Sequence, residues 1–354
     1  MIGHDVRSSR KSWRDDSPPV SKRISPPTHN PPLSACQQPL ARLLVHGTTL
    51  LLLLVPQTVR GQADVGAKIP EPAKALQGSL VICGGAALPP EVIQRFVDLA
   101  GGPAARLVVI PTATGLAEIP DELEPRIAIW RQQQVKELTF LHTRSPDIAN
   151  EPEFCEPLAR ATGVWFVGGV QSRITDAYLG TLAEQEFHGI LRRGGVIGGT
   201  SAGAAVMTQV MIRRGLPNGV DIGKGFGFFP NAVIDQHFLK RNRQARLLSV
   251  LNDHPGCFGL GIDEETAVVA QDQKLSVIGN SQAVVCFPSI GEEPAELVSL
   301  KSGDETDFTT ISERAVARAK NSATLIAEKQ RSTSSSADAR TESSTESATA
   351  AAMK

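Results

Sequence analysis

The sequence predicts an α/β fold in which a mostly parallel sheet is covered by helices on both faces. Short apolar runs of strand length alternate with amphipathic stretches of helix length over most of the chain. Several of these runs are apolar at every position, which is typical of parallel strands buried on both faces. In open sheets of this type, ligands bind beyond the carboxyl ends of the strands.

The predicted elements follow one another in regular order after residue 78. The helix after the first strand carries its apolar residues on one face, at Val92, Ile93, Phe96 and Leu99, and stops at two glycines. Further helices are expected over 122–134 and over 181–193. The first five expected strands are 79–85, 106–113, 137–143, 163–169 and 194–199.

The two ends of the chain differ in composition from this middle part, which we expect to form one domain over 78–290. Residues 1–63 are interpreted as a leader, because basic residues precede an apolar run at 43–56 and small residues follow it. This run is too short for a transmembrane helix, which needs about 20 residues. An export signal places the protein in the periplasm or outside the cell, whereas a mis-annotated start leaves it in the cytoplasm.

The other end is poor in large apolar residues. Residues 321–354 are rich in serine, threonine and alanine, and such a composition cannot offset the entropy lost on ordering. We therefore predict a disordered tail over 321–354. Residues 291–320 form a C-terminal extension whose order the composition does not decide.

Composition also excludes several classes of partner and cofactor. A net charge of −1 argues against nucleic acid as a partner. The five cysteines lack the paired spacing of a zinc site or a disulfide framework. The glycine-rich segment "GKGFGFFP" (223–230) lacks the Lys-Ser/Thr ending of a phosphate-binding loop. We expect neither a metal nor a cofactor.

A serine between glycines follows the last of these five strands. Gly199, Ser201 and Gly203 form a G-x-S-x-G pattern, which at a strand-to-helix turn is typical of a nucleophile elbow. The glycines permit a tight turn, and free N–H groups at the start of the next helix can face an anion near the hydroxyl. The pattern is common, so a glycine-rich turn with a capping serine is the competing interpretation.

A nucleophilic serine needs a base and an acid that orients it. His237 is the best base, because the polar sequence Asp235-Gln236-His237 ends a strand-like run at 232–234. Another apolar run ends in three acids, at Asp263, Glu264 and Glu265. This gives the order serine, histidine, acid. The order of an α/β-hydrolase, with Asp235 as the acid and His254 as the base, stays open on these grounds.

Three segments together carry a resemblance to a known family. "GGTSAGAAVM" (198–207), "DQHFLKRNRQARLL" (235–248) and "GIDEETA" (261–267) resemble the cyanophycinases of serine peptidase family S51, which also includes aspartyl dipeptidase, or peptidase E. The similarity spans about 78–287, with support from "VICGG" and "FVGGVQSRIT". It implies a fold related to class I glutamine amidotransferases.

The resemblance also implies a catalytic site and a reaction. Its triad maps onto Ser201, His237 and Glu264, and its oxyanion hole onto Gly169 and Ala202. The implied reaction is hydrolysis of cyanophycin, a polyaspartate that carries an arginine on each side-chain carboxyl, into β-Asp-Arg dipeptides. An aspartyl dipeptidase of the same family and a non-catalytic binding protein on the same fold are the alternatives.

A zwitterionic polymer requires a site that offers both charges. The arginines after His237 could hold substrate carboxylates, and Asp235 could receive a guanidinium. The family usually has asparagine where this chain has Val170, but the next residue, a glutamine, is retained. A homodimer is left open. The expected substrate-binding residues are Gln171, Asp235, Gln236, Arg241, Arg243 and Arg246.

Overall fold

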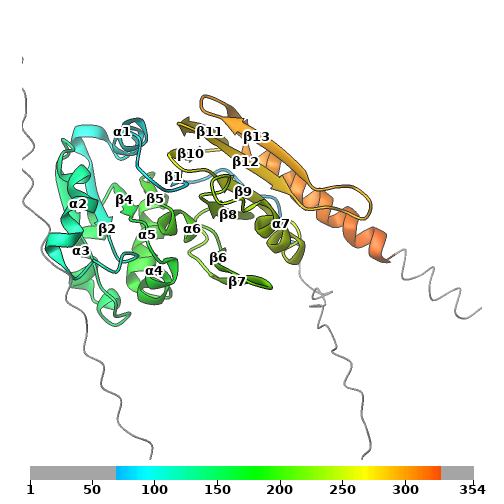
Figure 1. Cartoon of the computed structure of the whole chain (residues 1–354). Helices are drawn as coiled ribbons and strands as arrows, with labels where there is room; N and C mark the ends of the chain where they lie inside the picture. The colour runs from blue at the N-terminus through cyan, green and yellow to red at the C-terminus, as the bar shows by residue number, and fades with distance from the viewer. Residues whose placement is uncertain (1–68, 328–354) are drawn as a thin grey trace, which may run out of the picture. The chain divides into compact units, whose positions relative to one another are not determined.

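The computed structural model describes residues 69–327, and a large eight-stranded sheet runs through them (Figure 1). The strand order is β14-β11-β10-β1-β5-β4-β2-β3, which places β5 at the centre of the sheet between β1 and β4. These strands are β1 (Ser79–Cys83), β2 (Arg106–Ile110), β3 (Glu137–Phe140), β4 (Gly163–Phe166), β5 (Val196–Thr200), β10 (Thr266–Gln271), β11 (Lys274–Gly279) and β14 (Glu305–Asp307).

The sheet is mixed, so the prediction of a mostly parallel sheet was wrong. Strands β1, β5, β4, β2 and β3 are parallel to one another, as the alternation of strands and helices indicated. Strands β10, β11 and β14 continue the sheet in antiparallel pairing. A two-residue turn at Asp272 and Gln273 accounts for the β10–β11 pair, because so short a connection permits only antiparallel pairing.

Helices cover the parallel strands on both faces. On one face, α1 and α2 bury an aromatic cluster in which the ring of Phe96 lies 5.5 Å from that of Trp130 and 5.0 Å from that of Trp165. The opposite face packs against α3, α4 and α5. The bounds are α1 (Pro90–Leu99), α2 (Pro120–Arg131), α3 (Pro152–Arg160), α4 (Gln171–Tyr178) and α5 (Leu182–Arg192), with short 3-10 turns η1 (Gly102–Ala104) and η2 (Ile148–Asn150).

A second sheet of four strands packs against this opposite face. Its order is β13-β12-β9-β8, and β8 and β9 are parallel to each other. Leu260 and Val285 of this sheet belong to the same apolar core as Ile82 and Ile197 of the large sheet. The remaining elements are α6 (Ala202–Ala205), β6 (Val210–Leu216), β7 (Gly219–Lys224), β8 (Ala232–Gln236), α7 (Gln244–Asp253), β9 (Phe258–Ile262), β12 (Gln282–Phe287) and β13 (Glu296–Lys301).

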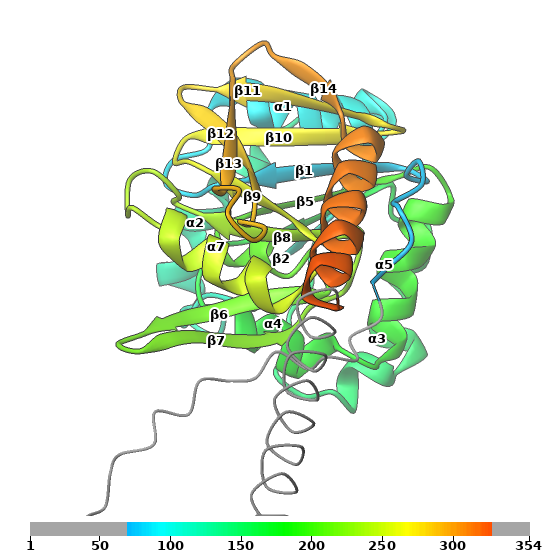
Figure 2. The same ribbon diagram turned by 90° about the vertical axis from the view of Figure 1, so that its right-hand side faces the viewer.

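The described part of the segment after residue 290 has regular secondary structure. It forms β13, β14 and a helix over 308–327, which runs across the strand direction in Figure 2. Phe308, Ala315 and Val316 form the buried face of this helix. The predicted tail starts at 321, but residues 321–327 continue the helix, because packing of its first turns stabilises helix that composition alone does not predict.

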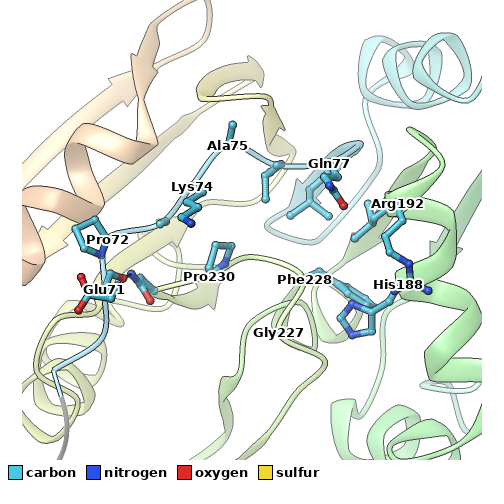
Figure 3. A pocket seen from close by; sticks show the side chains of 15 residues that line it. Glu71, Pro72, Lys74, Ala75, Gln77, His188, Arg192, Gly227, Phe228 and Pro230 are labelled. Atoms are coloured by element: carbon cyan, nitrogen blue, oxygen red, sulfur yellow. Dashed lines mark hydrogen bonds between the residues drawn. The ribbon is translucent and has the colours of Figure 1, made fainter.

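Residues 69–77 cross the ends of the strands opposite to Ser201. The Ala73 N–H donates to the Ser312 hydroxyl over 2.8 Å, and the Asn231 amide donates to the Glu71 carbonyl over 2.6 Å. Between this segment and α5 lies a cavity of about 510 Å³, lined among others by Lys74, His188 and Arg192 (Figure 3). The predicted leader and most of the predicted tail lie outside the described residues. Within 69–327, every helix is too short or too polar to cross a bilayer.

Candidate active site

Three consecutive carbonyls at the end of β1 bring the predicted site residues together. The Cys83 carbonyl accepts the Ser201 N–H over 3.0 Å, the Gly84 carbonyl accepts the His237 N–H over 2.8 Å, and the Gly85 carbonyl accepts the Glu265 N–H over 2.9 Å. The donors follow β5, β8 and β9, so segments far apart in sequence meet at one point. We call residues 83–85 the template segment.

All three donors have a left-handed or otherwise strained backbone. The φ angles are 52° at Ser201, 50° at His237 and 54° at Glu265. A non-glycine residue in such a conformation costs about 1–3 kcal/mol, and this cost persists only where surrounding contacts impose it. At Ser201, ψ is −106°, and the chain turns from β5 into α6 as a nucleophile elbow requires.

A continuous hydrogen-bonded series links serine, histidine and glutamate. The Ser201 Oγ lies 2.9 Å from the His237 Nε2, and the His237 Nδ1 lies 2.6 Å from a carboxylate oxygen of Glu264. With Nδ1 protonated toward Glu264, Nε2 is free to accept the serine proton. The geometry is that of base-assisted nucleophilic attack. His254 instead lies at the end of α7.

Burial favours the neutral form of the His237 imidazole. It lowers the pKa of His237 below the usual value, and the charge of Arg241 acts in the same direction, while the hydrogen bond to Glu264 raises this pKa. A neutral imidazole is the form that can accept a proton from Ser201. The low pKa therefore extends the base form toward acidic pH.

The two predicted oxyanion donors come from different elements beside the cleft. Ala202 is the first residue of α6, and the Gly169 backbone has a φ of 150° in the turn after β4. A side chain at Gly169 would lie 2.2 Å from the Ala113 carbonyl, so glycine is required there. That carbonyl also accepts the Val170 N–H over 2.9 Å. The loop after β2 thus sets the position of Gly169.

A charged clamp formed by Arg144, His142 and Glu118 holds this loop, and no sequence pattern indicated it. Arg144 donates to the Thr112 carbonyl over 2.5 Å, to the Thr114 carbonyl over 2.8 Å and to the Glu118 carboxylate over 2.6 Å. His142 contacts the same carboxylate over 3.0 Å. The hydrogen bonds from Arg144 and His142 lower the pKa of Glu118 to about 2. The Glu118 carboxylate therefore stays charged across the physiological range.

Asp235 already has a protein partner in the structure. Its side chain is 0% exposed, and both carboxylate oxygens accept hydrogen bonds from Arg246, one of them over 2.8 Å. Burial raises the pKa of Asp235, and Arg246 opposes that rise. Arg243 donates to the Gln236 side chain over 2.7 Å and to its carbonyl over 2.6 Å. The sequence suggested a substrate guanidinium at Asp235, where the structure has Arg246.

Of the remaining predicted substrate residues, Gln171 is hydrogen-bonded within the protein, whereas Arg241 is exposed. The Gln171 amide donates to the Ile212 and Arg213 carbonyls of β6, each over 2.7 Å, so it fastens the β6–β7 hairpin to α4. Arg241 is exposed and close enough to His237 to lower its pKa. Of the predicted arginines, Arg241 is the one whose guanidinium makes none of the described hydrogen bonds or ion pairs.

Ser201 and His237 open into a cleft of about 480 Å³ on the side of α2. Gly168 and Gly169 line the same cleft, so the hydroxyl, the base and one predicted oxyanion donor share a single solvent-accessible space. The cavity beneath residues 69–77 is larger but lies at the opposite ends of the strands. Among residues 69–327, no group of three or more His, Cys, Asp or Glu side chains has the arrangement of a metal site.

Comparison with known proteins identifies the family. The model of peptidase family S51 matches residues 80–278, which is more than half of the chain. This chain belongs to peptidase family S51. Membership confirms the resemblance found in the three segments around Ser201, His237 and Glu264, and it makes the protein a serine peptidase.

Curated relatives and a solved structure agree with this assignment. The S51 peptidase is 35% identical over 221 residues to a cyanophycinase of Geminocystis herdmanii, covering 59% of this chain and 80% of the relative. It is 35% identical to a cyanophycinase of Synechococcus elongatus, covering 56% of this chain and 63% of the relative, less than two thirds of its length. Among solved structures, a crystal structure of a peptidase from an acI-B1 Actinobacterium matches this chain with a TM-score of 0.51 at 23% sequence identity. The match covers 66% of this chain and 98% of the other chain, and it supports the fold alone.

Proposed function

We propose that this S51 peptidase is an exopeptidase that hydrolyses cyanophycin to β-Asp-Arg dipeptides through an acyl-enzyme. The observation that carries the proposal is the hydrogen-bonded series Ser201, His237 and Glu264 beside an open cleft. The similarity to relatives named cyanophycinase supports the choice of polymer.

In the first half of the reaction, the Ser201 hydroxyl attacks a backbone aspartyl carbonyl of the polymer. His237 Nε2 takes the hydroxyl proton as the new C–O bond forms, and Glu264 stabilises the imidazolium. The N–H groups of Gly169 and Ala202 stabilise the negative charge on the carbonyl oxygen as it develops. The amide C–N bond then breaks, and His237 delivers the proton to the leaving amine.

In the second half, water replaces the leaving group. His237 removes a proton from the water as its oxygen attacks the acyl carbonyl, and the tetrahedral intermediate collapses with loss of Ser201. The proton returns to the Ser201 oxygen, and the new carboxylic acid leaves. The chain's own groups thus supply base, acid and oxyanion stabilisation in both halves.

Recognition of the polymer requires cations near the triad. We propose that Arg241 and Arg246 bind carboxylates of the polymer, with Arg246 held in orientation by Asp235 as Arg243 is by Gln236. Removal of Arg246 leaves the buried Asp235 charge without its main partner, which costs about 3–5 kcal/mol of folding stability. Arg241 carries no such structural role, so Arg241→Ala tests binding more cleanly.

The proposed substrate is tested by offering three substrates to the purified protein. Cyanophycin should yield β-Asp-Arg dipeptides by mass spectrometry, whereas unmodified polyaspartate should be cut poorly because it lacks the arginyl units. A small aspartyl dipeptide is the third substrate. Preference for the dipeptide would identify an aspartyl dipeptidase, and a folded protein that cuts none of the three would indicate a binding protein.

We further propose that residues 43–56 direct export. The support is the basic stretch before this apolar run and the small residues after it. N-terminal sequencing of the protein from its native cells should find a mature chain that begins at about 61–63, in the periplasmic or external fraction. An intact leader on cytoplasmic protein would contradict export.

A further inference from the structure

The cleft beside Ser201 has walls that are apolar over most of their surface. Leu88 follows β1, Ile129 comes from α2, and Val167 follows β4. Trp130 and Trp165 also line the cleft, and both side chains are almost completely buried in the aromatic cluster. Walls of this kind suit the aliphatic part of a substrate and exclude water from its surroundings.

One permanently charged side chain lines this cleft. Arg126 on α2 is exposed, and the contacts described for residues 69–327 include no hydrogen bond or ion pair of its guanidinium. No aspartate or glutamate is among the cleft's lining residues. Arg131, on the same helix, differs: it pairs with Glu124 over 2.8 Å and lies over the Phe140 ring. Of these two arginines, Arg126 is therefore the unpaired one, and it lies on the wall of the cleft.

Charge and shape together define the group that this cleft accepts. A carboxylate gains a bidentate partner from a guanidinium, whereas a substrate guanidinium would be repelled and would find no acid in the cleft. We propose that Arg126 binds a carboxylate of the substrate, so that a peptide unit enters the cleft with its carboxylate toward α2 and its aliphatic part against the apolar walls. This inference rests on the proposed function and assigns one side of the site to acidic groups.

The test pairs a substitution in the protein with a change in the substrate. A short synthetic peptide of Asp-Arg repeats is compared with its counterpart in which the arginyl carboxylates are primary amides. For the parent, the contact with Arg126 should account for a loss of about two- to fivefold in kcat/KM on amidation, because an exposed charge pair contributes modestly. In Arg126→Gln amidation should cost less than in the parent by that factor, since the two changes remove the same interaction, and any remaining loss belongs to the carboxylates bound by Arg241 and Arg246.

Two further measurements separate this interaction from general effects. The loss in Arg126→Gln should lie mainly in KM, with kcat nearly unchanged, and should shrink at about 0.5 M salt, where exposed charges are screened. Arg131→Gln is the matched control, because it removes a paired arginine from the same helix outside the cleft. It should discriminate between acid and amide as the parent does.

The outcomes distinguish this inference from the proposed function. If Arg126→Gln prefers the acid peptide over the amide as strongly as the parent does, Arg126 does not bind the carboxylate, although the peptidase activity stands. If Arg131→Gln loses the preference as Arg126→Gln does, the effect belongs to the charge of α2 and the inference is wrong. A folded parent that cuts neither peptide overturns the proposed function, and this inference with it.

Discussion

Substitution of Gly85 by alanine should disable the site although it replaces no residue of the triad. A Cβ atom at Gly85 would lie 2.3 Å from the Cε1 and 2.5 Å from the Nε2 of His237. Ordinary contacts of a Cβ atom begin at about 3.4 Å. The imidazole must therefore retreat by about 1 Å, and its 2.9 Å hydrogen bond to Ser201 must lengthen beyond useful range.

The expected loss follows from this displacement. A misplacement of 1 Å in a catalytic group costs about 100-fold in rate, which corresponds to about 2.7 kcal/mol of transition-state stabilisation. The substitution also destabilises the fold by about 1–3 kcal/mol, because the φ of 118° at Gly85 is strained for alanine. Activity and stability must therefore be measured together.

The assay follows the labelling of Ser201 by a fluorophosphonate, which requires an activated serine but no natural substrate, alongside the unfolding temperature. Gly101→Ala is the control, because Gly101 has a φ of 109° and an added Cβ there would have its nearest neighbour at 3.8 Å. Both variants should lose similar stability. Only Gly85→Ala should be labelled about 100-fold more slowly. Labelling of Gly85→Ala at the parent rate would show that the imidazole keeps its place despite the added Cβ atom.

Three further predictions concern groups around the triad. Glu264→Gln should lower hydrolysis by about 10²–10⁴-fold, because it removes the charge that stabilises the imidazolium, while Glu265→Gln should keep nearly the parent rate; equal losses would contradict the assignment. Arg241→Ala should raise the pKa of His237, since it removes a positive charge that lowers it, so the acid limb of the kcat/KM profile should move to higher pH; an unmoved or lowered limb would count against this. Arg144→Ala should lower kcat about tenfold with little change in KM, because it releases the loop after β2 that sets the position of Gly169. A change confined to KM would exclude this positioning role.

Much of the site could be predicted because each of its residues follows a strand, one from the large sheet and two from the second sheet. Ser201 follows β5, His237 follows β8 and Glu264 follows β9, and the sequence shows each as a polar residue after an apolar run. The choice of Glu264 over Asp263 and Glu265 came from the resemblance alone. The structure gives the three acids different partners, since Asp263 accepts a hydrogen bond from Ser281 and Glu265 from Asn280.

Other parts of the site rest on contacts that no local pattern encodes. The template segment accepts hydrogen bonds through its backbone carbonyls from residues more than 100 positions later in the chain. In the sequence, "VICGG" indicated only the end of a strand. The pairing of Asp235 with Arg246 depends on how α7 packs against β8, so Asp235 was interpreted as free for substrate. Arg126 was assigned to a helix, and the cleft beside it forms only when α2 packs on the sheet. The antiparallel strands were missed because turn length, not hydrophobic period, determines their direction.

The proposal that Ser201 hydrolyses cyanophycin is tested most directly by incubating the polymer with the parent and with Ser201→Ala. The soluble products are then identified by mass spectrometry. The parent should release β-Asp-Arg dipeptides. Ser201→Ala should fold normally and lose activity by a factor on the order of 10⁶, as when a nucleophile acts as a unit with its base. Equal release of dipeptides by a folded Ser201→Ala variant, or an unchanged polymer after incubation with the folded parent, would contradict the account.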